Sequence, residues 1–293
     1  MTWGGRRALA GWLLIAPALV VILAIVGWPL IQTVRISFTD ANLIGGEEHW
    51  VGLANYARAL GSRDFLGALR TTVLFTLVTV SAEIVIGVLV ALMLDQPLHG
   101  RRFFRALLVL PWAMPTVINA MSWRLIYNPD FGALNALLTQ VGILSSYRSW
   151  LGDPATALWA VAVADIWKTF PLVSMIVLAA LQTVPREQIE AAHIDGANAW
   201  RRFQVVILPA IAGPLLVAAV LRTIEVMKVF DIIYVMTRGG PVNSTRTLSM
   251  QVYQEAFASL RAGSGASQGL LVLLFTTVLI AAYLKIVKRR APA

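Results

Sequence analysis

Residues 190–209 read EAAHIDGANAWRRFQVVILP, a polar and charged stretch between two strongly apolar segments. Just before it, Pro185 suits the first turn of a helix, where its missing N–H removes no hydrogen bond. The acidic Glu187 and Glu190 then lie near the positive end of that helix. Gly196 can take the left-handed conformation that commonly ends a helix. The stretch therefore predicts a short helix that stops at a tight turn.

A second short helix is predicted directly after this turn. Asn198 can cap it with its side chain, and the helix would run through Trp200 and Phe203. Pro209 marks the start of the next apolar segment. We therefore expect two short helices joined at a corner between two apolar spans.

Small residues remove side-chain bulk at this corner. Ala191, Ala192 and Gly196 would let the surface of another protein approach closely, and Glu190 offers a charge for pairing. The alternative interpretation is a solvated amphipathic connector without a partner, because short polar connectors are common. The residues alone leave both interpretations open.

The composition of the chain is that of a membrane protein. Hydrophobic residues make up 58% of its 293 residues, charged residues make up 13%, and the mean hydropathy is +0.73, far from the balance of a soluble domain. The net charge of +9 does not indicate nucleic-acid binding, because Lys and Arg lie scattered at the ends of apolar runs. The absence of Cys excludes disulfides, thiolate metal sites and cysteine nucleophiles.

Six apolar runs are long enough to cross a bilayer, which takes about 20 helical residues. We expect an all-α integral membrane protein in which residues 1–293 form a single transmembrane domain. The segment 182–206, which contains the corner, would connect the fourth span to the fifth. The expected spans are residues 10–34, 72–94, 103–127, 156–181, 207–235 and 268–287.

The first apolar run also has features of a signal peptide. Arg6 and Arg7 precede it, and Ala-Pro-Ala at residues 16–18 resembles a cleavage site. The run continues to Val34, however, which is too long for the apolar region of a signal peptide. We therefore expect a first transmembrane helix that is retained.

The distribution of Lys and Arg predicts the orientation. With a cytoplasmic N-terminus, the inner segments carry twelve of these residues in 54 positions, whereas the outer segments carry eight in 97. The positive-inside rule places the basic connections in the cytoplasm. Both termini and the corner are therefore expected on the cytoplasmic side.

Four short motifs follow one another along the chain: N-P-x-x-G-x-L-N at residues 128–135, W-x-x-x-P at 167–171, V-P-R-E-Q-I-E-A-A-x-x-D-G-A at 184–197 and T-x-G-G-P at 237–241. The third leads into Val-Ile-Leu-Pro at 206–209, with Val206 where isoleucine is usual. In these motifs the chain resembles the carbohydrate-type permeases of binding-protein-dependent ABC importers, such as the maltose and glycerol-phosphate systems. In that family the third motif is the EAA loop.

The resemblance implies a complex in the bacterial cytoplasmic membrane of two different permeases and two ATPase subunits, supplied by an extracytoplasmic solute-binding protein. The EAA helix would seat in a groove of the ATPase, and closure of the ATPase dimer on ATP would rock the spans from inward-open to outward-open. Coupling contacts are then expected from Glu190, Ala191, Ala192, Asp195 and Gly196.

The chain has no G-x-x-x-x-G-K-[ST] sequence and so is not expected to bind ATP through a P-loop. ATP and Mg²⁺ would bind to the separate ATPase subunits, and this chain would carry no cofactor and would not be an enzyme. The three histidines lie in connections without ligand spacing, so no metal site is expected at His49, His99 or His193.

The fifth expected span contains charges that each cost about 2.5–3.5 kcal/mol at the centre of a membrane helix. Arg222, Glu225, Lys228 and Asp231 alternate in sign at intervals of three and can pair along one face. They form either a self-neutralised ladder against another helix or part of a wet pathway that binds substrate hydroxyls. By the resemblance, sugar contacts come from this helix and the W-x-x-x-P stretch, which implies Trp167, Lys168, Thr169, Leu172, Arg222, Glu225, Val226 and Val229.

Three further ionisable residues lie in or near the spans. Asp165 and Lys168 are three residues apart and are expected to pair with each other. Glu83 is alone in the second span, and we expect it to make a hydrogen bond between helices.

Sugars are the expected substrates from the resemblance alone, and an anionic substituent would give Lys168, Arg222 or Lys228 a partner. A membrane-embedded enzyme is an alternative, but the sequence has no metal-ligand cluster and no paired His and carboxylate motif. A secondary carrier that couples transport to protons through buried carboxylates is another. A carrier would transport alone, whereas an ABC permease would be inert without its partner subunits.

Overall fold

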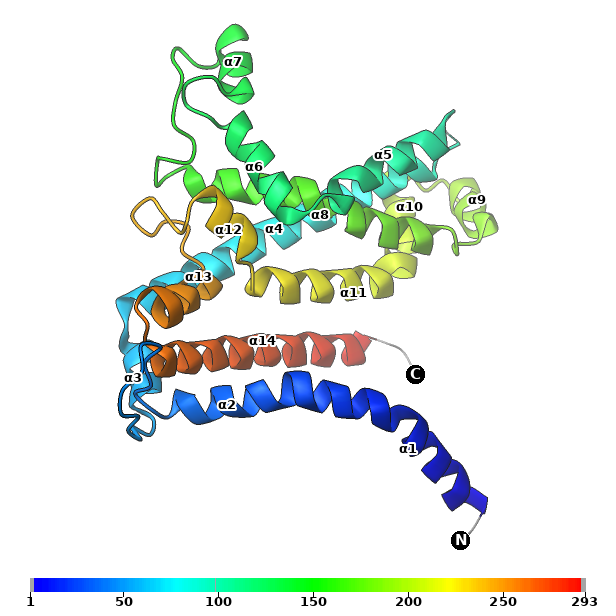
Figure 1. Ribbon diagram of the computed structural model, residues 1–293. Coiled ribbons are helices and arrows are strands. Elements are labelled where there is room, and N and C mark those ends of the chain that lie inside the picture. Colours follow the sequence, from blue (N-terminus) through cyan, green and yellow to red (C-terminus); the bar gives the residue numbers. More distant parts are fainter. Residues whose placement is uncertain (1–2, 98, 291–293) are drawn as a thin grey trace. The chain divides into compact units, whose positions relative to one another are not determined.

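A computed structural model describes residues 3–97 and 99–290 (Figure 1). Within these ranges the chain is helical, with one isolated antiparallel bridge between Thr39 and Trp50 and no β-strand. Five helical segments of the described chain are long and apolar enough to cross a membrane: Gly11–Ser37, Arg63–Asp95, Ala157–Leu181, Ala199–Met227 and Ala262–Tyr283. The all-α membrane fold predicted from the sequence is thereby confirmed.

The chain divides into two compact units. The first comprises residues 1–62 and 252–273, and the second comprises residues 63–251 and 274–293. Helix α14 (Ala262–Arg290) contributes residues to both units.

The first unit begins with a long helical segment made of α1 (Trp3–Ile22), a π-helical turn η1 (Leu23–Gly27) and α2 (Trp28–Ser37). It also contains α3 (Ala54–Gly61) and a π-helical turn η3 (Gln254–Ala258). The buried amide of Asn55 donates to the carbonyls of Ser37 (3.0 Å) and Thr39 (2.8 Å). This amide ties the end of α2 to the start of α3.

The second unit is organised around α4 (Arg63–Asp95), α8 (Ala157–Leu181) and α11 (Leu208–Met227). Their small and aliphatic side chains form one buried core: Val88, Ala91, Leu94, Val173, Val177, Leu178, Ala180, Leu181, Ile211 and Ala218. Shorter helices complete the unit: α7 (Ala133–Gln140), α9 (Arg186–Ile194), α10 (Ala199–Arg202), α12 (Asp231–Met236) and residues 248–251 of α13 (Leu248–Tyr253).

The third expected span, residues 103–127, is not a single straight helix. It consists of α5 (Arg101–Ala113) and α6 (Thr116–Ile126), whose axes differ by 94°. Met114 is extended (ψ 132°) and Pro115 precedes α6, as expected because a residue before proline is excluded from the helical region by its ring. The span predicted at residues 103–127 is therefore broken at Met114-Pro115.

The fifth expected span, residues 207–235, also has different bounds. It begins earlier, because α10 continues through a π-helical turn η2 (Phe203–Ile207) into α11. It ends at Met227, where Lys228 leaves the helical conformation (φ −111°, ψ 22°) and α12 starts afresh at Asp231. The four alternating charges are consequently not on one helix.

Close approach of α4 and α8 depends on Gly87. A Cβ at this position would lie 2.7 Å from Cγ1 of Val173 and 3.2 Å from the backbone nitrogen of Ser174. Small residues let membrane helices pack backbone against backbone, where no hydrophobic effect drives association.

We predict that Gly87→Val destabilises the protein by about 1–3 kcal/mol, because the added methyl groups force the two helices apart. Gly67→Val in the same helix is the control, since no heavy atom lies within 4 Å of its Cβ position. Thermal unfolding of the purified variants in detergent measures the difference. Equal midpoints for the two variants would refute the packing argument.

Candidate functional site

A buried ionic network joins the three central helices of the second unit. The guanidinium of Arg222 on α11 donates from Nε to Glu83 Oε2 (2.7 Å) and from Nη2 to Glu83 Oε1 (2.9 Å). Its Nη2 also lies 3.2 Å from Asp165 Oδ2 on α8. The side chain of Glu83 is fully buried and that of Arg222 is only 6% exposed. A bidentate pairing of the Arg222 guanidinium with the Glu83 carboxylate fixes the orientation of both groups.

Thr169 adds a neutral member to the network. Its hydroxyl lies 2.6 Å from Glu83 Oε1 and 2.6 Å from the carbonyl oxygen of Asp165, and Arg222 Nη2 donates to it at 3.2 Å. On the outer side of the network, Arg222 Nη1 pairs with Glu225, whose side chain is 56% exposed. The network thus extends from the buried carboxylate of Glu83 to the exposed carboxylate of Glu225.

The structure decides two expectations about these charges. Glu83 does bond between helices, to Thr169 and Arg222, as predicted. The expected pairing of Asp165 with Lys168 was wrong, because the Asp165 carboxylate turns to Arg222 instead. Sequence spacing favours the partner on the same helix, but the guanidinium arrives from α11 through tertiary packing.

A cavity of about 390 Å³ opens beside the network. Five of the eight pathway residues inferred from sequence line it: Lys168, Thr169, Arg222, Glu225 and Val229. The other three do not: Val226 is buried in the core, Leu172 is half-buried, and Trp167 packs edge-on against Trp123 with ring centroids 6.0 Å apart. The remaining lining residues are Trp112, Thr116, Asp165, Lys228, Phe230, Asp231 and Ile232.

Sequence reasoning missed the cavity's aromatic and apolar wall. Trp112 and Thr116 reach it because α5 and α6 bend at Met114-Pro115, and Phe230 and Ile232 reach it because the chain breaks after α11. Pro115 was the one available signal for the first break. No comparable signal precedes Lys228.

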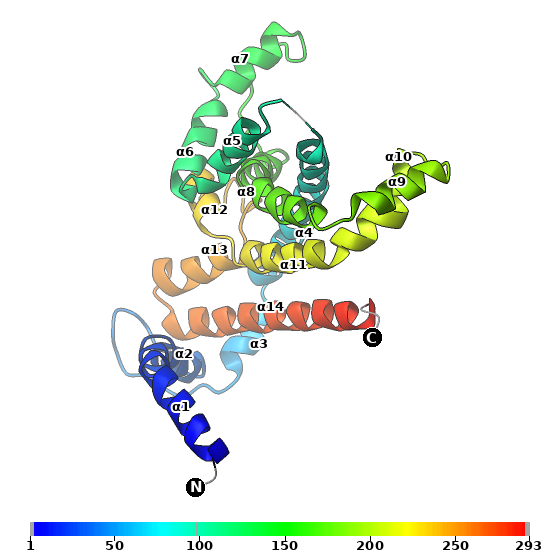
Figure 2. The same ribbon diagram turned by 90° about the vertical axis from the view of Figure 1, so that its right-hand side faces the viewer.

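The predicted corner is present between α9 and α10, which project from the ends of α8 and α11 (Figures 1 and 2). Gly196 has the expected left-handed backbone (φ 78°), and the N–H of Ala197 bonds back to the carbonyl of Ala192 (3.0 Å). The Asn198 side chain accepts from the N–H of Arg201 (2.8 Å), as its capping role predicts. Arg202 braces the turn by donating to the carbonyl of Ala197 (2.8 Å).

The surface of this corner is open. Glu190, Ala191, Asp195 and Gly196 are exposed and Ala192 is half-buried. The apolar Ile194 and Trp200 are 85% and 65% exposed. Large apolar side chains left bare beside small residues are typical of a surface that another protein covers.

Two of the other motifs have structural explanations. In the first, the fully buried Asn135 accepts from the Trp150 indole N–H (2.9 Å) and donates to the carbonyls of Asn128 (3.2 Å) and Arg148 (3.0 Å). In the last, the hydroxyls of Thr237 and Thr245 are 2.7 Å apart, and Gly239 has a positive φ of 85°. Both motifs therefore fix connections between helices.

Residues 265–269, Gly-Ala-Ser-Gln-Gly, have the spacing of the nucleophile motif of serine hydrolases, which our sequence reasoning overlooked. They lie inside α14, where the buried Ser267 hydroxyl donates to the carbonyl of Ser264 (2.7 Å). A nucleophile elbow needs a strand, a sharp turn and a helix. The match therefore gives no support to an enzyme.

We predict that Arg222→Met lowers the free energy of unfolding by about 3–5 kcal/mol, because it strands Glu83 and Asp165 as buried carboxylates without a cation. Lys228→Met is the matched control, since it removes one positive charge from an exposed position at the same cavity. Thermal unfolding in detergent compares them. A change no larger than the control's would show that the network does not stabilise the helices.

Comparison with known proteins gives a consistent result. Residues 83–291 match the family described as "Binding-protein-dependent transport system inner membrane component". The trehalose/maltose transport system permease protein MalF of Thermococcus litoralis is 42% identical over 248 residues, which cover 85% of this chain and 83% of that protein. The sulfoquinovosyl glycerol transport system permease protein SmoG of Agrobacterium fabrum is 33% identical and covers 98% and 92%.

The fold has a close counterpart among solved structures. A chain of a bacterial ABC transporter involved in the import of alginate superposes with a TM-score of 0.85 over 98% of both chains, at 20% identity. The family match covers more than half of the chain, and it coincides with the helices that hold the ionic network and the corner. This chain belongs to the inner membrane component family of binding-protein-dependent transport systems.

Proposed function

We propose that this chain is the permease subunit of an ATP-driven importer, which passes a sugar or sugar derivative across the cytoplasmic membrane by alternating access. The observation that carries the proposal is the exposed corner between α9 and α10, which continues without interruption into the span α11. A force applied to the corner would therefore be transmitted to α11 along one continuous helical segment. The same helix carries Arg222 and Glu225 into the cavity.

The proposed partners are a second, different permease, two ATPase subunits and an extracytoplasmic binding protein. Glu190 would pair with a basic group of the ATPase, while Ala191, Ala192 and Gly196 leave room for its surface and Asp195 adds a second charge. ATP and Mg²⁺ would be bound by the ATPase subunits, and this chain would have no catalytic residue. The exposed Ile194 and Trp200 support a covered surface here rather than a solvated connector.

The proposed orientation places both termini and the corner in the cytoplasm. The corner lies at the Leu181 end of α8, and the cavity described below brings the Asp95 end of α4 and the start of α5 to the same end. Arg101, Arg102, Arg105 and Arg186 lie there, which supports a cytoplasmic face by the positive-inside rule. We propose that residues 1–293 act as one transmembrane domain.

A sugar or sugar derivative is the proposed cargo. The relatives are named for trehalose and maltose and for sulfoquinovosyl glycerol. The cavity offers donors and acceptors of both signs, and Lys168, Lys228 and Asp231 make no ion pair within 4.0 Å among the described residues. These side chains are available to hydroxyl groups or to an anionic substituent.

We predict that Glu190→Ala abolishes substrate-stimulated ATP hydrolysis while the subunits still co-purify, because it removes a single exposed charge from the proposed coupling surface. The measurement is the ATPase activity of the complex reconstituted with its partner subunits and binding protein. Glu187→Ala is the control, an exposed carboxylate one turn earlier in the same helix.

Two results would argue against this role. Stimulation that is equal in the Glu190 and Glu187 variants would remove Glu190 from the coupling contact. Transport by this chain alone would favour the secondary carrier, in which no ATPase is needed.

We also predict that Glu225→Ala lowers uptake of the cognate substrate while leaving assembly intact, because this carboxylate is the open end of the network and lines the cavity. Losing one hydrogen bond to a charged group corresponds to roughly a tenfold or larger effect. Asp130→Ala, an exposed carboxylate outside the cavity, is the control. Uptake equal to that of the control would exclude Glu225 from the pathway.

A further inference from the structure

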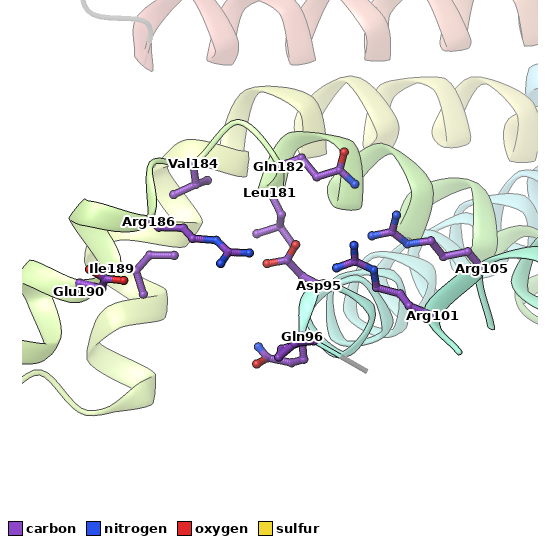
Figure 3. Close-up of a pocket in the computed structure, with 11 residues that line it drawn as sticks. Asp95, Gln96, Arg101, Arg105, Leu181, Gln182, Val184, Arg186, Ile189 and Glu190 are labelled. Carbon is purple, nitrogen blue, oxygen red and sulfur yellow. The ribbon is translucent and has the colours of Figure 1, made fainter. Parts of the chain in front are cut away.

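A second cavity, of about 560 Å³, lies where α4 and α8 end and where α5 and α9 begin (Figure 3). Three arginines line it from different elements: Arg101 and Arg105 from α5, and Arg186 from the start of α9. The ionic network described above does not include this cavity. Its polar groups therefore need another explanation.

The positive charges of these arginines are not taken up by ion pairs among the described residues. Among the described residues, Arg101, Arg105 and Arg186 make no ion pair within 4.0 Å. Arg105 is half-buried, its Nε is buried without a hydrogen-bond partner, and its Nη2 reaches the carbonyl of Leu94 only at 3.5 Å. A buried donor left unpaired is destabilising, so a ligand that accepts a hydrogen bond from it is stabilising.

Two carboxylates share the cavity, Asp95 and Glu190, and leave it with one net positive charge. In Figure 3 the Asp95 carboxylate lies between the guanidinium groups of Arg186 and Arg101. Arg101 is also the first residue of α5, where the helix dipole favours an anion over a cation. The remaining positive charge and the start of α5 thus favour one further anionic group beside the two carboxylates.

An apolar groove adjoins this cavity and identifies the kind of ligand. It has a volume of about 460 Å³ and is walled by aliphatic and aromatic side chains, including Val88, Leu89, Leu92, Phe203 and Ile207. It shares five residues with the charged cavity: Asp95, Gln96, Leu181, Val184 and Ile189. A charged hollow that continues into an apolar one fits an amphiphile with a compact anionic head.

We propose that these two hollows bind one anionic phospholipid, with its phosphate among Arg101, Arg105 and Arg186 and part of an acyl chain in the groove. Arginine recognises phosphate through paired N–H donors, which matches the open guanidinium groups here. Because Ile189 and Glu190 belong to α9, the lipid would directly contact the first helix of the proposed coupling corner. The consequence for coupling rests on the proposed function, whereas the binding itself does not.

The test is native mass spectrometry of the full-length chain purified in detergent with its co-purifying subunits, titrated with phosphatidylglycerol and with phosphatidylcholine. The double variant Arg101→Gln and Arg186→Gln is compared with Arg102→Gln and Arg201→Gln, which removes the same charge from exposed positions on α5 and α10 outside the cavity. We expect the affinity for phosphatidylglycerol to fall at least about tenfold in the first double variant only. Each lost charge-assisted hydrogen bond corresponds to roughly that factor.

A third variant is expected to raise the affinity for phosphatidylglycerol instead of lowering it. Asp95→Asn removes the carboxylate that competes with the phosphate, so phosphatidylglycerol should bind several-fold more tightly. A misfolded variant would not produce this gain. Equal retention in both double variants, with no gain in Asp95→Asn, would overturn the site.

Inorganic phosphate distinguishes the source of the anion. If it binds in an arginine-dependent manner while phosphatidylglycerol does not, the cavity is a site for a soluble phosphate and the lipid assignment is wrong. Retention of phosphatidylcholine equal to that of phosphatidylglycerol would show that the groove alone holds the lipid, which also overturns the proposal. None of these readouts requires transport, so they stay separate from the test of the coupling role.

Discussion

The guanidinium of Arg222 is the point on which the central helices depend. Three spans each bring a polar side chain to it: Glu83 from α4, Asp165 and Thr169 from α8, and Glu225 from α11 itself. Charges within a membrane domain are tolerated when they pair with one another or face a water-filled cavity, and Arg222 is buried and paired. The relative register of α4, α8 and α11 is therefore set by one buried cation, and the close approach at Gly87 supports the same arrangement.

This dependence links the two ends of the second unit. Helix α8 leads into α9 and helix α11 continues from α10, so the corner sits directly on the two helices that meet at Arg222. A displacement of the corner cannot move α11 without changing how Arg222 is held by Glu83 and Asp165. Because the open member, Glu225, also lines the cavity, such a change would reach any ligand bound there. The network can thus serve as a stabilising element and as part of the pathway, which the sequence presented as alternatives.

Much of this arrangement could be predicted from the sequence because its signals are local. The corner follows from Gly196 and Asn198, and both residues have the predicted geometry. The apolar runs predict the spans, since length and composition suffice for that. The pairing of Asp165 could not be predicted, because it depends on where α11 lies against α8. The break after Met227 was missed because the regular spacing of the charges suggested one continuous helix. Helix α11 instead ends at Met227, and Phe230 and Asp231 then line the cavity.

The break at Lys228 also explains why the charged series is not fully neutralised. On one continuous helix, Glu225, Lys228 and Asp231 would be neighbours on the same face and would satisfy one another. With α11 ending at Met227, Arg222 pairs with Glu225 but Lys228 and Asp231 separate and face the cavity with Lys168. A chain selected only for stability in the membrane would keep such charges paired or omit them, given their cost. Leaving two cations and a carboxylate available at the cavity wall is consistent with a pathway that exchanges its water for the polar groups of a substrate.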